Sequence, residues 1–214
     1  MRRYLAESLG TALIVLAVVG SAHMATFLTK DSGVWLLINC LSTVSALYIS
    51  ILLFRNISGA HFNPIVSIIA GLQRALSGKE VGLYLLAQFT GAIFGVMVAN
   101  SMFDSPILSI SNINRANSGT LVGELISSAG LITLIFAHWL TISNDRRATL
   151  ISLWIASAYF FTSSTSFANP AVSFGRIFTE SYAGIDVRSF ALFLLAQSMG
   201  GAIAFLMMKR VGKP

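Results

Sequence analysis

The sequence predicts an all-α membrane protein with six transmembrane helices and two short helices that enter the bilayer and turn back. Three observations lead to this fold class. The 214 residues are 55% hydrophobic and only 10% charged, whereas a soluble domain carries about 25% charged residues. Six stretches are long and apolar enough to cross a bilayer, which takes roughly 20 residues. In each half of the chain, an Asn-Pro pair starts a much shorter segment.

The low charge content also excludes several classes of protein. With a mean hydropathy of +0.78, the chain has too few charges to cover a water-facing surface. This excludes a soluble enzyme, a disordered protein and a nucleic-acid binder, despite the formal net charge of +6. The single cysteine, Cys40, excludes a disulfide framework and a cysteine-based metal site.

The six apolar stretches cover, in order, residues 4–28, 33–54, 81–103, 119–143, 148–167 and 187–208. The first follows Arg2 and Arg3, as the apolar core of a secretory signal peptide would. Its apolar part runs from Leu9 through Phe27 and is longer than a typical core of that kind. We therefore predict a retained span, with a cleaved signal as the alternative.

The basic residues predict the orientation of the spans. Six spans place both termini on one side of the membrane, and ten of the fourteen basic residues fall on that side. Because basic residues concentrate in the cytoplasm, we expect both termini there. The ten are Arg2, Arg3, Arg55, Arg74, Lys79, Arg146, Arg147, Lys209, Arg210 and Lys213, and the other four are Lys30, Arg115, Arg176 and Arg188.

The chain also contains an internal repeat within a single channel domain, residues 1–214. Its halves are approximately residues 1–104 and 118–210. Three matching pairs occur in the same order in both halves: Glu7 with Glu124, Gln88 with Gln197, and Asn63-Pro64 with Asn169-Pro170. Each half holds three spans, an odd number, so the second half is inverted relative to the first. Inverted repeats place a site near the bilayer midplane.

The two Asn-Pro segments predict half-helices. Asn is a favourable N-cap and Pro is favoured at the first helical position. We expect helices from Asn63 to about Leu76 and from Asn169 to about Phe178. At about 1.5 Å per residue, each spans about half a bilayer. The irregular backbone before each, residues 58–62 and 165–168, must line a wet cavity or be buried in protein.

Small residues within the spans predict close helix packing. They are Ala6, Gly10, Gly91, Gly95, Gly200 and Gly201.

Taken together, the motifs resemble the aquaporin, or major intrinsic protein, family. The resemblance rests on SGAHFNP (Ser58–Pro64), on the second motif NPA (Asn169–Ala171) and on the paired Glu7 and Glu124. It implies a pore through each subunit, a homotetramer and a bacterial inner membrane. The residues after the second motif are similar to those of a bacterial aquaglyceroporin-like subgroup linked to arsenical permeation.

The resemblance assigns roles to the paired motifs. Asn63 and Asn169 offer N–H donors to the pore, where they interrupt the hydrogen-bonded water wire that carries protons. Glu7 and Glu124 are expected to brace the re-entrant loops, which we favour over a role in proton transport. Backbone carbonyls along the path are expected at Gly59, Ala60, His61, Ser166, Phe167 and Ala168. His61 is expected to line the cytoplasmic half, with a structural hydrogen bond as the alternative.

The sequence departs from the family in its selectivity filter. Most members have Arg directly after the second motif, where this chain has Val172. A gapless count places Thr43, Ser157 and Ser166 at the other filter positions, and an insertion would bring Tyr159 or Phe160 in place of Ser157. Such a filter predicts a wider, Arg-less mouth. In the first motif, Ile65 stands where most members have Ala.

The sequence is compatible with two roles for the Arg176 side chain. It follows Val172 by four residues, which places it on the same helix face about 6 Å nearer the outer mouth. It either forms a cationic group in the outer vestibule or extends to the outer interface as an anchor, which we slightly favour.

These features predict a passive channel for water, glycerol, urea, hydrogen peroxide or metalloid hydroxides such as arsenous acid. The alternatives are a water-selective channel and, less favoured, an ion-leaky channel. No catalytic set is present, so we predict neither enzyme activity nor a cofactor. His23, His61 and His138 have no metal-ligand spacing, so no metal site is expected. The expected partners are small neutral solutes and the lipid bilayer.

Overall fold

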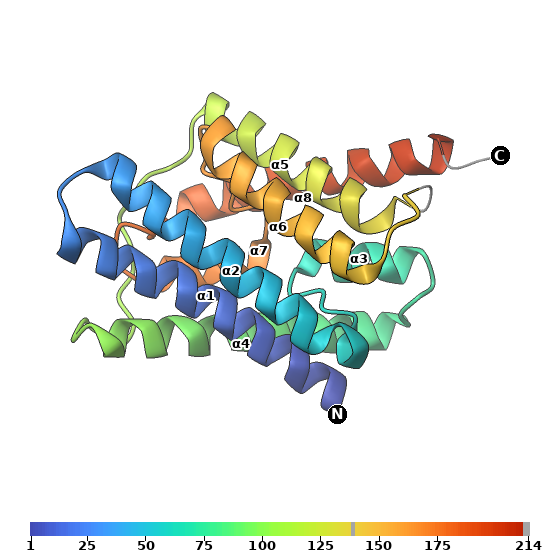
Figure 1. The fold of residues 1–214 in the computed structure, drawn as a ribbon, viewed down its shortest axis with the longest axis horizontal. Helices are drawn as coiled ribbons and strands as arrows, with labels where there is room; N and C mark the ends of the chain where they lie inside the picture. The colour runs from blue at the N-terminus through green and yellow to red at the C-terminus, as the bar shows by residue number, and fades with distance from the viewer. Residues whose placement is uncertain (138–139, 212–214) are drawn as a thin grey trace.

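The computed structural model describes residues 1–137 and 140–211. All regular structure in these ranges is helical, so the predicted fold class is confirmed (Figure 1). The long helices are α1 (Arg2–Leu28), α2 (Ser32–Ser58), α4 (Gly78–Met102), α5 (Ser118–Phe136), α6 (Asn144–Phe161) and α8 (Val187–Val211). The short ones are α3 (Pro64–Leu72), α7 (Pro170–Gly175) and the 3-10 turn η1 (Arg176–Phe178).

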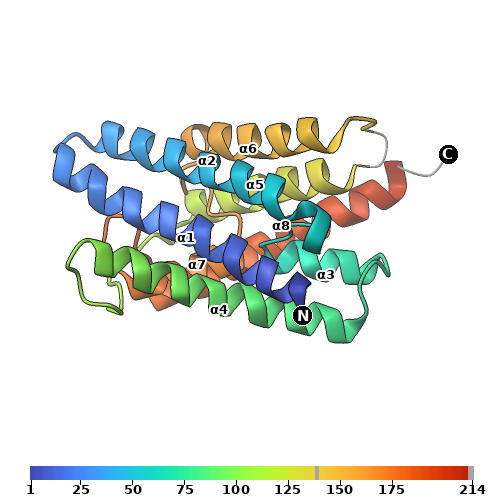
Figure 2. The ribbon, with the colours of Figure 1, turned by 60° about the horizontal axis from the view of Figure 1, so that its bottom comes forward.

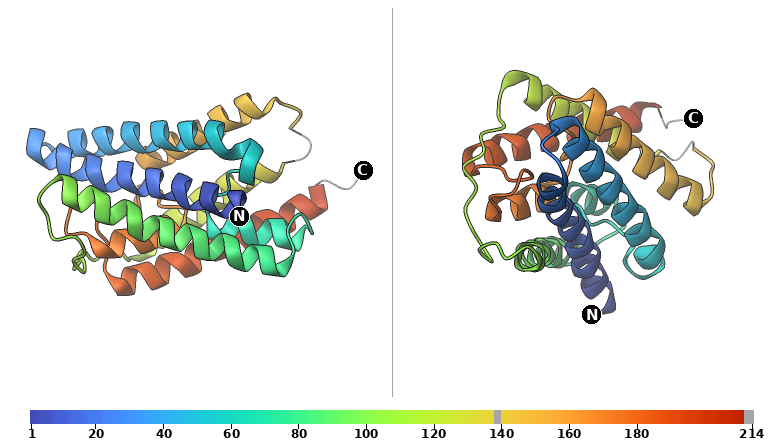
Figure 3. Two further views of the ribbon diagram at one scale, coloured as in Figure 1. Left: turned by 90° about the horizontal axis from the view of Figure 1, so that it is seen from below. Right: turned by 60° about the vertical axis from the view of Figure 1, so that its left-hand side comes forward.

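Among the described residues, five helices are long and apolar enough to cross a membrane: α1, α2, α4, α5 and α8. The remaining long helix, α6, begins with the charged residues Asp145, Arg146 and Arg147 directly after Asn144. It nevertheless packs against α2 and α5 as part of the bundle. The long helices run along the long axis of the molecule and cross at an angle (Figure 3).

The start of α1 and the end of α8 lie toward the same end of the bundle (Figure 2). The turn between α3 and α4 lies at that end too, whereas residues 29–31 and 103–117 lie at the opposite end. The termini-side end is hereafter the inner end, and the other is the outer end.

The fourth expected span, 119–143, is longer than the helix observed. Helix α5 ends at Phe136, because Ala137 is already extended at ψ 95°. Arg147 of α6 donates to the carbonyls of Leu134 at 2.7 Å and Ile135 at 3.3 Å. A guanidinium thus satisfies carbonyls that continued helix would have satisfied. Residues 138–139, including His138, lie outside the described residues.

The fifth expected span, 148–167, also extends too far at its C-terminal end. Helix α6 stops at Phe161, and Thr162 is extended with φ −101° and ψ 141°. Thr165 and Ser166, which follow, have positive φ and are not helical. These residues form the loop that leads into the second Asn-Pro motif. The stretch predicted as one span is therefore divided between helix α6 and this loop.

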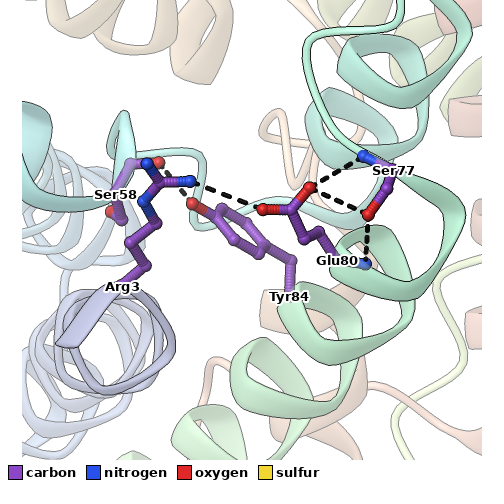
Figure 4. Close-up of polar contacts among 5 residues, drawn as sticks. All are labelled: Arg3, Ser58, Ser77, Glu80 and Tyr84. Atoms are coloured by element: carbon purple, nitrogen blue, oxygen red, sulfur yellow. Dashed lines mark hydrogen bonds and ion pairs between the residues drawn. The ribbon is translucent and has the colours of Figure 1, made fainter. Parts of the chain in front are cut away.

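Helix α2 is longer than expected and ends in contact with α4. Gly59 adopts φ 89° as the left-handed cap after Ser58, a conformation that favours glycine. The Tyr84 hydroxyl donates to the Ser58 carbonyl at 2.7 Å. Nearby, Glu80 accepts from the backbone and hydroxyl of Ser77 and lies 3.5 Å from Arg3 (Figure 4). These contacts join α1, α2 and α4 at the inner end.

The small residues allow helices to pack backbone against backbone. A Cβ on Gly91 would collide with the backbone of Ser8, and a Cβ on Gly95 would collide with that of Ala12. A Cβ on Gly200 would collide likewise with the backbone of Leu125. The prediction of close packing at these glycines is confirmed for the pairs α1–α4 and α5–α8.

Gly201 explains how the chain accommodates Ile65. Ile65 packs in a buried cluster with Ile132 and residues of α8. A Cβ on Gly201 would lie 2.5 Å from Cγ2 of Ile65. The bulk that the first motif gains at position 65 is therefore matched by the missing side chain at position 201.

Replacing Gly201 by Ala is expected to destabilise the protein by about 1–3 kcal/mol, the usual cost of overpacking a core. In an Ile65→Ala background the same replacement should carry no such cost, because the clash is gone. Thermal unfolding in detergent measures both effects. Gly82→Ala is the control, since a Cβ there meets nothing within 4 Å. Equal losses from Gly201→Ala in both backgrounds would contradict the pairing.

Candidate functional site

A narrow cavity of about 70 Å³ lies where α3 and α7 meet inside the bundle. Both Asn-Pro motifs reach it, and so do side chains of α1, α2, α5 and α6. Most of the wall is apolar, formed by residues such as Ile14, Leu47, Leu131 and Ile155. At about 10–15 Å³ for each water, the cavity has room for a handful of water molecules.

The two asparagines bind each other's motif. Asn63 Nδ2 donates to the Ala168 carbonyl at 2.8 Å, and Asn169 Nδ2 donates to the Phe62 carbonyl at 2.7 Å. Their Oδ1 atoms cap the short helices by accepting from Ile65 and Ala171, each at 3.0 Å. A side-chain amide carries two N–H groups. Because both asparagines line the cavity, the second N–H of each is available to a molecule inside it.

Glu7 holds the approach to the first motif. It is fully buried and accepts from the backbone N–H groups of His61 at 2.9 Å and Phe62 at 2.7 Å. It also accepts from the Ser58 hydroxyl at 2.6 Å and from Gln88 at 2.8 Å. The carboxylate thus draws the loop's N–H groups toward itself.

Glu124 makes the equivalent contacts in the second half. It is fully buried and accepts from the N–H groups of Phe167 at 2.8 Å and Ala168 at 2.9 Å. Gln197 donates to it at 2.6 Å and to Ser173 at 3.1 Å. The sequence singled out both glutamines as repeat markers, but their contacts with the acids became visible only in the structure.

The braced loops hold a strained backbone. Ala60 and Phe62 have φ of 54° and 48°, and the matching Ser166 and Ala168 have φ of 52° and 46°. Each non-glycine residue in this conformation costs about 1–3 kcal/mol and persists only where its surroundings enforce it. The acids enforce it here, since their acceptor atoms bind N–H groups of the same loops.

The backbone carbonyls expected along the path differ in their partners. Those of Gly59, Ala60, His61, Ser166 and Phe167 accept no hydrogen bond from the described residues. The Ala168 carbonyl already accepts from Asn63, and the Phe62 carbonyl, which the sequence reasoning missed, accepts from Asn169. Of the residues with unpaired carbonyls, His61, Ser166 and Phe167 line the cavity, and an unpaired carbonyl there is an acceptor for a polar molecule.

Three of the four expected filter residues line the cavity: Thr43, Ser166 and Val172. Ser157 is exposed on the outside of the bundle and does not. The gapless count therefore chose the wrong residue of α6. Tyr159, the alternative, lines the cavity, whereas Phe160 is 57% exposed.

Tyr159 is held by two neighbours on α2. Its hydroxyl lies 3.0 Å from Thr43 Oγ1 and 3.3 Å from Asn39 Oδ1. Asn39 is itself fixed by donating to the Val18 carbonyl at 2.7 Å. An aromatic ring thus stands in a wall for which the gapless count predicted no ring, and Asn39 had not been singled out.

Arg176 is buried, at 3% exposed, and lines the same cavity. The reading in which it extends to the interface is therefore wrong. Its Nε donates to the Ala183 carbonyl, and its Cζ lies 3.3 Å from the centre of the Phe167 ring. A cation thus stands near the cavity one turn beyond Val172.

A second arginine, Arg115, lies beside it and was missed as a site residue. Burial lowers the pKa of Arg115 below its ordinary value, and arginine remains charged in proteins. The available signal was that Arg115 is the sole Lys or Arg in the outer loop, residues 103–117.

The two described histidines, His23 and His61, have separate hydrogen-bond partners. His61 lines the cavity, and its Nδ1 lies 3.0 Å from the Ser67 hydroxyl, so both roles weighed for it coexist. His23 instead pairs with Asn100 at 3.2 Å. In residues 1–137 and 140–211, no three His, Cys, Asp or Glu side chains converge to hold a metal ion.

Comparison with known proteins places this cavity in context. The family model described as "Major intrinsic protein" matches residues 1–208. Aquaglyceroporin AqpS from Rhizobium meliloti (strain 1021) is 38% identical over 213 residues, covering 100% of this chain and 91% of that protein. Aquaporin TIP2-3 from Arabidopsis thaliana is 24% identical, covering 96% of this chain and 85% of that protein.

The fold also matches a solved structure. The X-ray structure of the aquaglyceroporin from Plasmodium falciparum superimposes with a TM-score of 0.79. The two chains are 23% identical, and the match covers 100% of this chain and 97% of that one.

Proposed function

Because this chain belongs to the major intrinsic protein family, we propose that it is a passive transmembrane channel for water and small uncharged solutes. Members of this family are channels rather than enzymes, and the chain carries solutes without transforming them. One observation supports the proposal above all. Two asparagine amides from opposite halves meet in a narrow cavity whose wall is otherwise mostly apolar.

The paired amides determine how water passes. A water molecule at the centre accepts hydrogen bonds from Asn63 and Asn169 with its oxygen, so its hydrogens point away from both. The mostly apolar wall offers this water molecule few other hydrogen-bond partners. This orientation breaks the chain of donors and acceptors along which protons would move. The unpaired carbonyls on either side then accept from successive waters.

The proposed substrates are glycerol, urea, hydrogen peroxide and metalloid hydroxides such as arsenous acid. Val172 occupies the position where most members of the family carry Arg, which leaves room beside the second motif. Thr43 and Ser166 add hydroxyl groups to the wall. The Ser166 hydroxyl is buried and has no partner among the described residues.

A water-selective channel is the second candidate. Tyr159 and Arg176 favour it, because an aromatic ring and a cation both stand at the cavity and reduce its width. The third candidate, an ion-leaky channel, is disfavoured by the same arginine, since a buried cation repels permeating cations. Solute flux separates the first two candidates, and electrical conductance separates both from the third.

The wider setting is part of the proposal. The chain is an inverted repeat of residues 1–104 and 118–210, and it assembles as a homotetramer in a bacterial inner membrane. Both termini lie in the cytoplasm, since the basic residues gather at the inner end. Large apolar side chains on the outside of the bundle, such as Leu41, Phe94, Leu153 and Leu195, are suited to lipid or to a neighbouring subunit.

Stopped-flow light scattering on proteoliposomes tests the proposal. Shrinkage under an osmotic gradient of an impermeant solute reports water flux, and reswelling in glycerol or urea reports solute flux. Both should exceed the values for protein-free liposomes. Voltage clamp of the reconstituted protein should show no current. Water flux without glycerol or urea flux would favour the water-selective channel, and current would favour the ion-leaky one.

Tyr159→Ala is expected to raise glycerol flux severalfold relative to water flux, because it removes a ring from the cavity wall. Ser157→Ala is the matched control on the same helix, and it should change neither flux because Ser157 is exposed outside the bundle. The same proteoliposome assay measures both variants. A change with Ser157→Ala and none with Tyr159→Ala would restore the original filter assignment.

A further inference from the structure

Two arginines from distant parts of the chain bind one short stretch of backbone at the outer end. Arg115 donates from Nε to the Gly184 carbonyl at 2.6 Å and from Nη2 to the Tyr182 carbonyl at 2.5 Å. Arg176 donates to the carbonyl between them, that of Ala183. Three successive carbonyls therefore each accept from one guanidinium or the other.

The same two groups share an aromatic ring. The Cζ atoms of Arg176 and Arg115 lie 3.3 Å and 5.4 Å from the centre of the Phe167 ring. Phe167 belongs to the loop that Glu124 braces, and its backbone N–H donates to that acid. Both guanidinium groups therefore lie over a side chain of the loop that leads into the second Asn-Pro motif. Cation–π contact is favourable where it is desolvated.

Within residues 1–137 and 140–211, neither cation forms an ion pair with an acid. Among the described residues, the ion pairs are Arg3–Glu80 and Arg55–Asp145, both at the inner end. Holding two like charges close together in a buried place is costly unless something compensates. Backbone carbonyls and a ring provide that compensation here, and they leave the positive charge unneutralised.

Arg115 is firmly anchored in its loop. Its backbone N–H donates to Ser189 Oγ at 2.9 Å, and its carbonyl accepts from Thr120 Oγ1 at 2.8 Å. Ser189 lies in the first turn of α8 and Thr120 in the first turn of α5. The loop is therefore tied to two long helices. Arg176, in contrast, sits on a single 3-10 turn, and in the described structure its side chain has one hydrogen bond.

We propose that Arg115 positions the guanidinium of Arg176 and that Arg176, held in this way, forms the cation barrier of the outer mouth, replacing the arginine absent from position 172. This inference rests on the proposed channel function. By bridging the carbonyls of Tyr182 and Gly184, Arg115 holds the Ala183 carbonyl where Arg176 Nε meets it. The Nη groups of Arg176 then remain free to face the cavity, where they repel cations and donate to oxygen atoms of neutral solutes.

Potassium permeability normalised to water permeability tests the proposal in proteoliposomes of the full chain. Arg176→Gln should raise this ratio by about tenfold, and so should Arg115→Gln, since charges lining a mouth alter local ion concentration by at least that factor. The double variant should leak no more than Arg176→Gln alone, because Arg115 acts through Arg176. Arg188→Gln, an exposed charge at the same outer end, is the control and should leave the ratio unchanged.

Arg115→Lys separates position from charge. Lysine keeps the positive charge but lacks the planar fork that reaches two carbonyls. The ratio should therefore rise in this variant too, which also keeps the test decisive if Arg115→Gln does not reconstitute. An unchanged ratio in either variant would overturn the positioning role, as would leaks that multiply in the double variant.

Solute flux through the wild-type protein tests the proposed channel function separately from this inference. Glycerol or urea flux through the wild-type protein that does not exceed that of empty liposomes would contradict the proposed function. Normal wild-type flux with no potassium leak in the Arg115 variants would contradict this inference alone.

Discussion

An arginine introduced at position 172 is expected to reduce glycerol and urea flux at least about tenfold, a change that corresponds to about 1.4 kcal/mol of barrier. Val172 is buried and lines a cavity of only about 70 Å³. A longer, charged side chain there would occupy the space beside the second motif and add a cation close to Arg176. Water is smaller and should still pass. Stopped-flow measurements of all three solutes test the prediction.

Val172→Met is the matched control for charge. Methionine adds length without charge, so a similar loss of glycerol flux would assign the effect to bulk, and a smaller loss would assign it to charge. Both results keep Val172 as the residue that leaves the mouth open. Glycerol flux that is unaffected by Val172→Arg would contradict the wide-filter proposal.

Removing the carboxylate of Glu124 is expected to have the largest effect on stability. In Glu124→Ala, the N–H groups of Phe167 and Ala168 and the amide of Gln197 lose their acceptor. A buried donor left unpaired costs about 1–3 kcal/mol. Three of them would remove much of the 5–15 kcal/mol by which folded proteins are typically stable. The unfolding temperature in detergent and the yield of a single species on gel filtration measure the loss.

Two further variants sharpen this test. Glu7→Ala should have a comparable effect, because Glu7 accepts from two loop N–H groups, a hydroxyl and a glutamine amide. Glu180→Gln is the control, since Glu180 is exposed and accepts from a single serine hydroxyl. Wild-type melting of Glu124→Ala would show that the strained loops hold their shape without the acid.

The helices could be predicted because their signals are local or periodic. Apolar length located the long helices, and Asn-Pro pairs located the starts of α3 and α7 to within a residue. The ends were harder to predict. Where α5 ends depends on Arg147 reaching back to its carbonyls, and where α6 ends depends on loop residues with positive φ. These contacts join residues that a hydropathy profile treats separately.

The site was predictable wherever the two halves repeat. Two pairs of residues occur in the same order in both halves: Glu7 with Glu124, and Asn63 with Asn169. In the structure, the two members of each pair bind equivalent partners. The residue from α6 had no such counterpart. A count without gaps selected Ser157, but the helix rotation presents Tyr159 to the cavity instead.

The sequence by itself therefore determined the membrane setting, the order of the helices and the paired motifs, because composition, periodicity and repetition can be read along the chain. Only the tertiary structure decided what surrounds Val172 and Arg176. Tyr159 comes from α6, Arg176 from the turn after α7, and Arg115 from a loop that precedes α5. Their meeting depends on how the helices rotate and on which carbonyls remain unpaired, and neither property is encoded in local spacing.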